Sequence, residues 1–188
     1  MFSNPFATRY IRPGAQDYIF PPGSSAEQLV ETLRQNNWCG QIIGPHGSGK
    51  STLVAAIIPA LQSAGRNVIH YPSAIQLDAT TQLVVDGYEQ LSWLQRRSLV
   101  QRCKKFQAGL LVTAHRDMHL PTLVLTEPSL ELTRAVVARL LAAGSDSITA
   151  DEIADAYQQT GGNIRETLFK LFDVYQERSH RSNIKAED

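Results

Sequence analysis

Eight consecutive residues carry the strongest chemical signal in this chain. The segment 44–51 reads Gly-Pro-His-Gly-Ser-Gly-Lys-Ser and matches the phosphate-binding pattern G-x-x-x-x-G-K-[ST] at each fixed position. Its glycines allow backbone conformations that turn successive N–H groups toward a phosphate. Lys50 is placed to reach the β- and γ-phosphates, and the Ser51 hydroxyl to ligate Mg²⁺. The predicted triphosphate-binding residues are Gly44, Pro45, His46, Gly47, Ser48, Gly49, Lys50, Ser51 and Thr52. An ordinary glycine-rich turn is the alternative.

Two carboxylates supply the second half of a candidate active site. The apolar run 83–85 ends in Asp86, and a carboxylate at that position can hold Mg²⁺ through a water molecule. We therefore predict Ser51 and Asp86 as the metal residues. Glu89 follows three residues later, where it could orient or deprotonate an attacking water. A turn-forming aspartate and a solvated helix acid are the alternative interpretations of the pair.

The elements that must position these residues are short strands alternating mostly with helices. Helices are expected from Ser24, which begins a capping-box pattern, to Gln35, and over 52–62 and 90–106. The apolar runs at 40–43, 67–71, 82–86, 109–113 and 122–125 are typical of strands. This alternation predicts an α/β fold with a parallel sheet covered on both faces.

The chain divides into four segments. Residues 1–23 contain several prolines and glycines and predict an extended arm, and residues 24–126 form the α/β core. Residues 127–178 contain only helical patterns, at 128–142, 149–159 and from Asn163 onward. The polar tail 179–188 is expected to be disordered.

The amino-acid composition of the chain limits the classes of function that we expect. The charges of eighteen basic and eighteen acidic residues cancel, so no net charge favours binding to nucleic acid or to a membrane. Five basic residues and no acidic ones nevertheless gather between Gln90 and Gln107. Cys39 and Cys103 have no metal or redox spacing, and we expect both to be small buried hydrophobic residues. The absence of a membrane-span or signal-peptide pattern predicts a cytoplasmic location.

The motif, the strand ending in Asp86 and the helical segment after the last strand together resemble the AAA+ and STAND groups of P-loop ATPases. The resemblance covers roughly 24–178 and implies a P-loop NTPase three-layer sandwich with a parallel five-stranded sheet, followed by a small all-helical lid. It also implies ATP and Mg²⁺ as ligands. AAA+ members usually carry the catalytic glutamate directly after the magnesium aspartate, where this chain has Gly87. The order Asp-Gly-x-acid is more similar to NACHT proteins, and it leaves fast hydrolysis open.

The same resemblance implies further site residues. A polar sensor at the end of the fourth strand would be Thr113 or Arg116, facing the γ-phosphate. A second sensor would be Arg165 at the start of a lid helix, where a cation is disfavoured by the helix dipole unless an anion lies nearby. The arm could line a base pocket with Arg9, Tyr10, Tyr18 and Phe20, although the interpretation that these residues only pin the arm is slightly favoured.

The leading hypothesis is therefore a Mg²⁺-dependent ATP-binding protein with ATPase activity, using Lys50, Glu89, Thr113, Arg116 and Arg165, and coupling ATP or ADP to lid movement. One alternative is a nucleotide-gated binding module with little turnover, with the basic helix as a nucleic-acid surface. Another is a small-molecule kinase. A homo-oligomer or protein partner also stays open, with Arg116 acting in cis or in trans.

Overall fold

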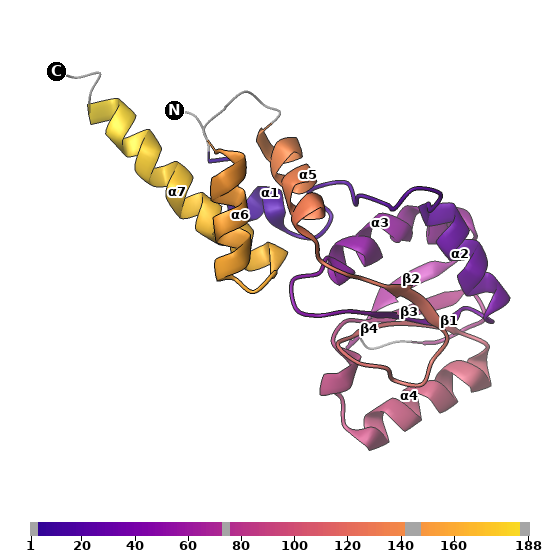
Figure 1. Ribbon diagram of the computed structural model, residues 1–188. Helices are drawn as coiled ribbons and strands as arrows, with labels where there is room; N and C mark the ends of the chain where they lie inside the picture. The colour runs from indigo at the N-terminus through magenta and orange to yellow at the C-terminus, as the bar shows by residue number, and fades with distance from the viewer. Residues whose placement is uncertain (1–3, 73–75, 142–147, 185–188) are drawn as a thin grey trace. The chain divides into compact units, whose positions relative to one another are not determined.

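The computed structural model describes residues 4–72, 76–141 and 148–184 (Figure 1). These residues form two compact units. The α/β unit contains Phe20–Pro45 and Lys50–Thr126. The helical unit contains the N-terminal arm up to Ile19, the loop tip His46–Gly49 and the chain from Glu127 onward.

The α/β unit is built on a five-stranded sheet. Its strands are β1 (Cys39–Ile43), β2 (Asn67–His70), β3 (Thr81–Val85), β4 (Gly109–Ala114) and β5 (Thr122–Leu125). They lie in the order β2-β3-β4-β1-β5, and each neighbouring pair is parallel. All residues of β3 and β4 are buried, as expected for central strands covered on both faces. The predicted parallel five-stranded sheet is confirmed.

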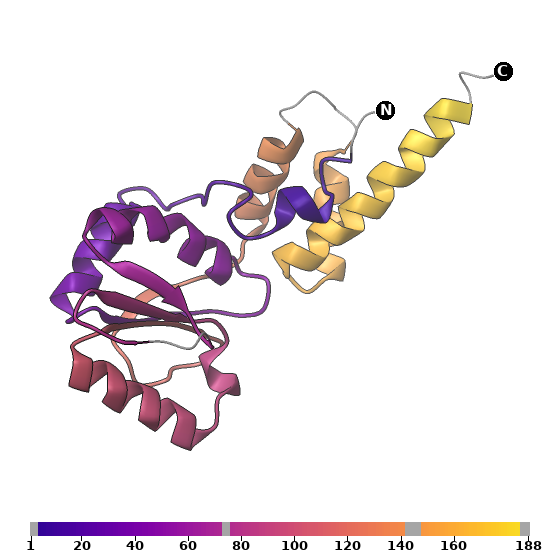
Figure 2. The same cartoon turned by 180° about the vertical axis from the view of Figure 1, so that it is seen from behind.

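Helices cover both faces of this sheet and complete the predicted three layers (Figures 1 and 2). α2 (Ala26–Gln35) and α3 (Lys50–Ser63) lie on one face, and α4 (Trp93–Phe106) lies on the other. The helix expected from Gln90 begins later, because the 3₁₀ turn η1 (Tyr88–Gln90) precedes it and Ser92 caps it. The cap of α2 is Ser25, whose hydroxyl accepts from Gln28 N, and not Ser24. The core under α4 comprises Leu77, Leu83, Val85, Tyr88, Leu99, Cys103, Ala108, Leu110 and Val112.

The strand register brings the carboxyl ends of three strands together. Val85 of β3 pairs with Val112 of β4, and Ala114 of β4 pairs with Ile43 of β1. Because the strands are parallel, the residues that follow them leave the sheet at one edge. This edge carries the phosphate loop after β1 and Asp86 after β3.

The helical unit comprises α5 (Leu130–Leu141), α6 (Ala150–Gln159) and α7 (Ile164–Ile184), with the short α1 (Thr8–Ile11) in the arm. A capping box at Thr149 begins α6, as the sequence predicts. The arm is not extended throughout, since it contains α1. Phe6 is fully buried in the unit's core and meets Tyr175 edge-on, with ring centroids 6.2 Å apart. Burial of the Phe6 ring fixes the arm to the C-terminal helices.

α7 continues to Ile184, whereas the sequence predicts disorder from residue 179. The last part of that predicted tail, residues 185–188, lies outside the described residues. In the part of the chain that the structure describes, no helix combines the length and apolar character needed to cross a membrane. Both cysteines are free thiols: Cys103 is buried, and burial raises its pKa to about 11, while Cys39 is half-buried. The expectation of two buried cysteines therefore holds fully only for Cys103.

A polar side chain inside the sheet holds the loop between β4 and β5. Gln41, on the central strand β1, is 1% exposed. Its Nε2 donates to Asp117 Oδ1 at 2.8 Å and Leu120 O at 2.6 Å, and its Oε1 accepts from Met118 N at 2.9 Å. One glutamine thus satisfies several polar groups of this loop, which a hydrophobic residue could not do.

We expect Gln41→Leu to destabilise the α/β unit by about 3 kcal/mol, because it leaves the buried partners of the amide without hydrogen bonds. Urea unfolding followed by circular dichroism measures this loss. Gln35→Leu, on the exposed side of α2, is the matched control and should change stability little. Equal stability of Gln41→Leu and the unmodified chain would show that water replaces these bonds at no cost.

Candidate functional site

The phosphate loop joins β1 to α3 through two glycines with positive φ. Gly47 has φ +70° and Gly49 has φ +91°, in the left-handed range that glycine adopts without strain. α3 then begins at Lys50, so its unpaired N–H groups and positive dipole end lie at the loop. The sequence-predicted strand, loop and helix are therefore all present.

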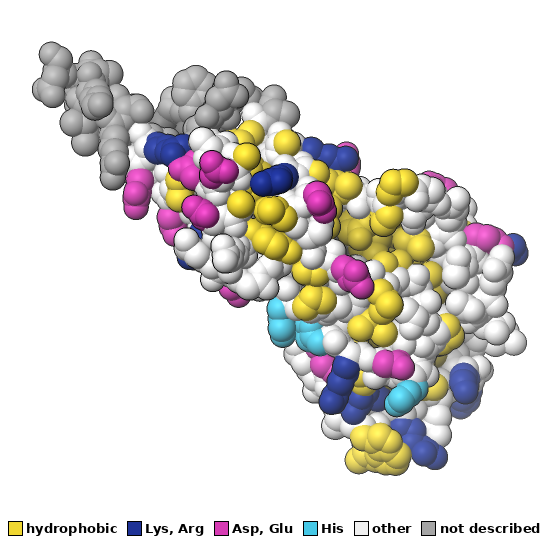
Figure 3. Space-filling view, in the orientation of Figure 1, with side chains coloured by type: hydrophobic (Ala, Val, Ile, Leu, Met, Phe, Trp, Pro, Cys, Tyr) yellow, Lys and Arg dark blue, Asp and Glu magenta, His cyan; other side chains and the backbone are white. Residues whose placement is uncertain are grey.

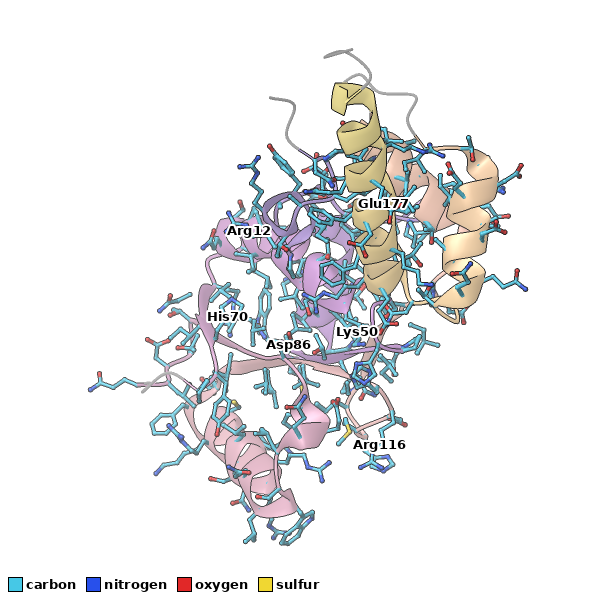
Figure 4. All side chains as sticks on the ribbon, turned by 90° about the vertical axis from the view of Figure 1, so that its left-hand side faces the viewer. Arg12, Lys50, His70, Asp86, Arg116 and Glu177 are labelled. Atoms are coloured by element: carbon cyan, nitrogen blue, oxygen red, sulfur yellow. The ribbon has the colours of Figure 1, made fainter. Side chains whose placement is uncertain are left out.

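Lys50 lies against the loop it follows. Its Nζ donates to Gly44 O and Pro45 O, both at 2.7 Å, and lies 3.3 Å from His115 Nδ1. Burial lowers the pKa of Lys50, and the nearby carboxylates of Glu89 and Asp86 partly oppose this effect. The ammonium group therefore lies in a partly desolvated site between the loop and two acids (Figure 4).

Asp86 joins the loop helix to the central strand. Its Oδ2 accepts from Ser51 Oγ at 3.0 Å, and its Oδ1 accepts from Thr113 Oγ1. Thr113 Oγ1 in turn accepts from Gly87 N at 3.0 Å. Thr113 is fully buried, and its hydroxyl orients Asp86. The hydrogen bond to Asp86 is a partner that the sequence does not predict for Thr113, and its role toward a γ-phosphate stays a prediction.

Glu89 and His115 also lie at the edge of the sheet that carries the phosphate loop and Asp86. Glu89 Oε1 lies 3.3 Å from His115 Nε2. His115 Nδ1 lies 3.0 Å from Gly44 O, so the imidazole bridges the loop and the acid. Glu89 Oε2 is buried and has no hydrogen-bond partner among the described residues. A buried carboxylate oxygen of this kind is available to accept a proton or a hydrogen bond from a water.

The donor set fits magnesium and a triphosphate. A hydroxyl and a carboxylate, 3.0 Å apart, are the hard oxygen ligands that Mg²⁺ accepts while keeping several waters. Lys50 and the N-terminus of α3 supply positive charge for phosphate oxygens. When bound, the metal would neutralise developing charge on the phosphates, and Ser51 and Asp86 would hold it.

The tip of the phosphate loop belongs to the helical unit. A Cβ at Gly47 would lie 1.8 Å from Asn163 Oδ1, which also caps α7 by accepting from Glu166 N. A Cβ at Gly49 would lie 3.7 Å from Tyr18 Cε2 of the arm. Tyr18 and the start of α7 therefore both neighbour the loop tip. Of the other predicted loop residues, Ser48 is buried, Pro45 and His46 are exposed, and Thr52 is half-buried.

The two predicted site arginines, Arg116 and Arg165, are both exposed. Arg116 is exposed on the loop after β4 and lines a surface hollow with residues of α4 (Figure 4). It stands apart from Lys50 and Asp86, so the predicted role of facing the γ-phosphate has no geometric support within the α/β unit. Arg165 is exposed on the first turn of α7, two residues after Asn163.

His115 is the site residue that sequence reasoning missed. The resemblance predicts a polar sensor in the segment Thr113-Ala114-His115-Arg116, but the sequence pattern does not show which side chain faces the loop. Alternation along an extended segment is the signal that would find it: Thr113 and His115 both face the edge that carries Asp86 and the phosphate loop, while Arg116 faces away.

Comparisons with known proteins agree with this geometry at a coarse level. No protein-family model matches the chain. The chain is 28% identical over 165 residues to the zinc import ATP-binding protein ZnuC 1 of Hahella chejuensis, a match that covers 81% of this chain and 59% of that protein. It therefore spans about three fifths of that relative. A solved structure of C. elegans PCH-2 matches with a TM-score of 0.44 and 11% identity, over 81% of this chain and 66% of that one. The loop motif, the parallel sheet and the likeness in sequence together support a P-loop NTPase.

Proposed function

We propose that this chain is a Mg²⁺-dependent ATP-binding protein with ATPase activity. The observation that carries the proposal is the Asp86 carboxylate, held between Ser51 of the loop helix and Thr113 of β4, with Glu89 one turn further along. The relative from Hahella chejuensis is named as an ATP-binding protein, which favours ATP as the nucleotide.

Each residue has a separate task in this proposal. Lys50 leaves the carbonyls of Gly44 and Pro45 to bind β- and γ-phosphate oxygens. Ser51 and Asp86 hold the metal, and Thr113 fixes the rotamer of Asp86. Glu89 orients the attacking water through its unpaired Oε2 and accepts its proton.

We place this activity among the AAA+ and STAND ATPases, with the helical unit as a nucleotide-responsive lid. The support is local: the loop tip neighbours Asn163, which caps α7, and Arg165 lies in the first turn of that helix. A γ-phosphate would attract Arg165 and offset its unfavourable position at the positive end of the helix dipole. Hydrolysis removes that anion and releases the helix.

A second candidate is a nucleotide-gated switch with little turnover, of the NACHT-like kind. Its support is that Glu89 Oε1 is already engaged by His115, so that the acid is held by a group that also touches Gly44. In this case ATP binds tightly, and phosphate release is slow until Glu89 is freed.

The Lys50→Ala substitution should lower Mg²⁺-dependent phosphate release by roughly 100-fold or more, because it removes the main cation for the γ-phosphate. Glu89→Gln should cause a similar loss in turnover, about 100-fold, with ATP binding retained. Phosphate release and binding of a fluorescent ATP analogue measure the two effects. Lys105→Ala and Glu131→Gln, both at exposed helix positions, are the matched controls.

Unchanged hydrolysis in Glu89→Gln would remove Glu89 as the base. Tight ATP binding without turnover in the unmodified chain, at any protein concentration, would favour the switch over the ATPase.

Gly47→Ala should weaken ATP binding for two reasons, the positive φ and a collision with the Asn163 amide. Gly49→Ala carries only the φ strain, because its Cβ meets no atom closer than 3.7 Å. Adding Asn163→Ala should therefore recover part of the ATP affinity of Gly47→Ala and none of that of Gly49→Ala. Equal recovery in both backgrounds would contradict the proposed contact between the loop and the lid helix.

His115→Ala should reduce phosphate release about tenfold, because Glu89 then loses the group that positions it. The decisive readout is a double-mutant cycle: His115→Ala combined with Glu89→Gln should be no slower than Glu89→Gln alone. His70→Ala, at an exposed strand end, is the control. Multiplicative losses would show that His115 acts on the nucleotide independently of Glu89.

A further inference from the structure

A hollow separate from the phosphate loop lies between α4 and the loop that follows β4. Its volume is about 530 Å³, within the range of ligand and peptide pockets. The lining residues are Tyr88, Trp93, Arg96, Arg97, Val100, Gln101, Arg116, Asp117, Met118 and His119. All belong to the α/β unit. None of these side chains is needed by the proposed hydrolysis mechanism.

The hollow is cationic and its charges are not neutralised. Arg96, Arg97 and Arg116 have no carboxylate partner among the described residues. Arg96 Nη1 contacts Met118 Sδ at 3.9 Å, and its Nε is buried without a hydrogen bond. Arg97 instead lies over the ring of Trp93, with Cζ 5.4 Å from the centroid. Three arginines thus face the same concave surface with spare hydrogen-bond donors.

Asp117 is the one acidic residue that lines the hollow, and its carboxylate is hydrogen-bonded to groups other than the arginines. Asp117 Oδ1 accepts from Gln41 Nε2 at 2.8 Å and from His119 N at 2.7 Å. These hydrogen bonds lower the pKa of the Asp117 carboxyl and fix the loop. The acid therefore shapes the wall of the hollow, and the arginines retain their charge for a ligand.

Large apolar side chains are exposed beside the arginines. Trp93 is 62% exposed and Leu94 is 69% exposed, at the first turn of α4. Figure 3 shows basic side chains next to hydrophobic surface at the end of the molecule where α4 lies. Burying such residues on a partner removes apolar area from water, and exposed tryptophan next to arginine is the composition of interface hot spots.

We infer that this hollow binds an acidic peptide segment that carries a large apolar side chain. Carboxylates of the segment pair with Arg96, Arg97 and Arg116, and its apolar side chain packs on Trp93. Charge complementarity selects the acidic partner, since the arginines are unpaired. The apolar residues select a protein over a nucleic acid: no lysine lines the hollow, while Met118 and Val100 offer aliphatic surface that a base or phosphate does not match.

Selection from a displayed library of random twelve-residue peptides tests this inference on the full chain. We expect the selected peptides to be enriched in Asp and Glu and to contain Phe, Leu or Trp. One synthesised, fluorescein-labelled peptide should bind at least tenfold more weakly to Arg97→Glu, and about 30-fold more weakly to Trp93→Ala. Arg102→Glu, an exposed charge reversal on the same helix but outside the hollow, should bind as the unmodified chain does.

The inference is overturned by any of three results: no enrichment of acidic residues, binding that Arg97→Glu and Trp93→Ala leave unchanged, or tighter binding of a twelve-nucleotide oligothymidylate that Trp93→Ala abolishes. The last result would assign the surface to single-stranded nucleic acid. Because the assay contains no nucleotide, its outcome is independent of the proposed ATPase activity.

Discussion

The parallel pairing of β3, β4 and β1 is the constraint on which the candidate site depends. β4 lies between the other two, and the pairs Val85 with Val112 and Ala114 with Ile43 fix where each strand ends. Asp86, His115 and Gly44 follow these ends and can meet only in this register. A shift of one residue in β4 would turn Thr113 away from Asp86, because side chains alternate between the two faces. Buried apolar residues directly before the site residues therefore set the geometry of the site.

The loop after β4 extends this constraint outward. Gln41 holds Asp117, Met118 and Leu120 from inside the sheet, so the loop is anchored to the strand that carries the phosphate loop. His115 leaves β4 toward Gly44 and Glu89, and its neighbour Arg116 lines the surface hollow. His115 and Arg116 are adjacent in the chain, but His115 belongs to the candidate site at the phosphate loop and Arg116 to the hollow. Tyr88 lines the same hollow directly before Glu89, so a ligand there would contact the neighbours of both Glu89 and His115.

Local patterns in the sequence predicted most of the fold and the loop, for physical reasons. Strand and helix periodicity and the caps at Thr149 and Asn163 depend on neighbouring residues alone. The side-chain partners depend on register and packing, which one sequence does not encode locally. For this reason the sequence places Thr113 in the site without its partner Asp86, and it does not single out His115. The arm shows the same limit, since burial of Phe6 in the helical unit arises from contacts more than a hundred residues away.

Gly87 explains why the candidate base is displaced from Asp86. Its φ is +70°, and its N–H donates to the Thr113 hydroxyl that orients Asp86. A glutamate here would be strained in its backbone, because a residue with a Cβ rarely adopts this φ, and the Gln90 side chain, 2.8 Å from such a Cβ, would have to move aside. The left-handed turn that secures Asp86 thus disfavours an acid at the next position, and the acid that follows in this segment is Glu89 in the 3₁₀ turn. There its carboxylate meets His115. In the proposed ATPase, the rate of hydrolysis then depends on how His115 shares Glu89 with the attacking water, and not on the phosphate loop alone.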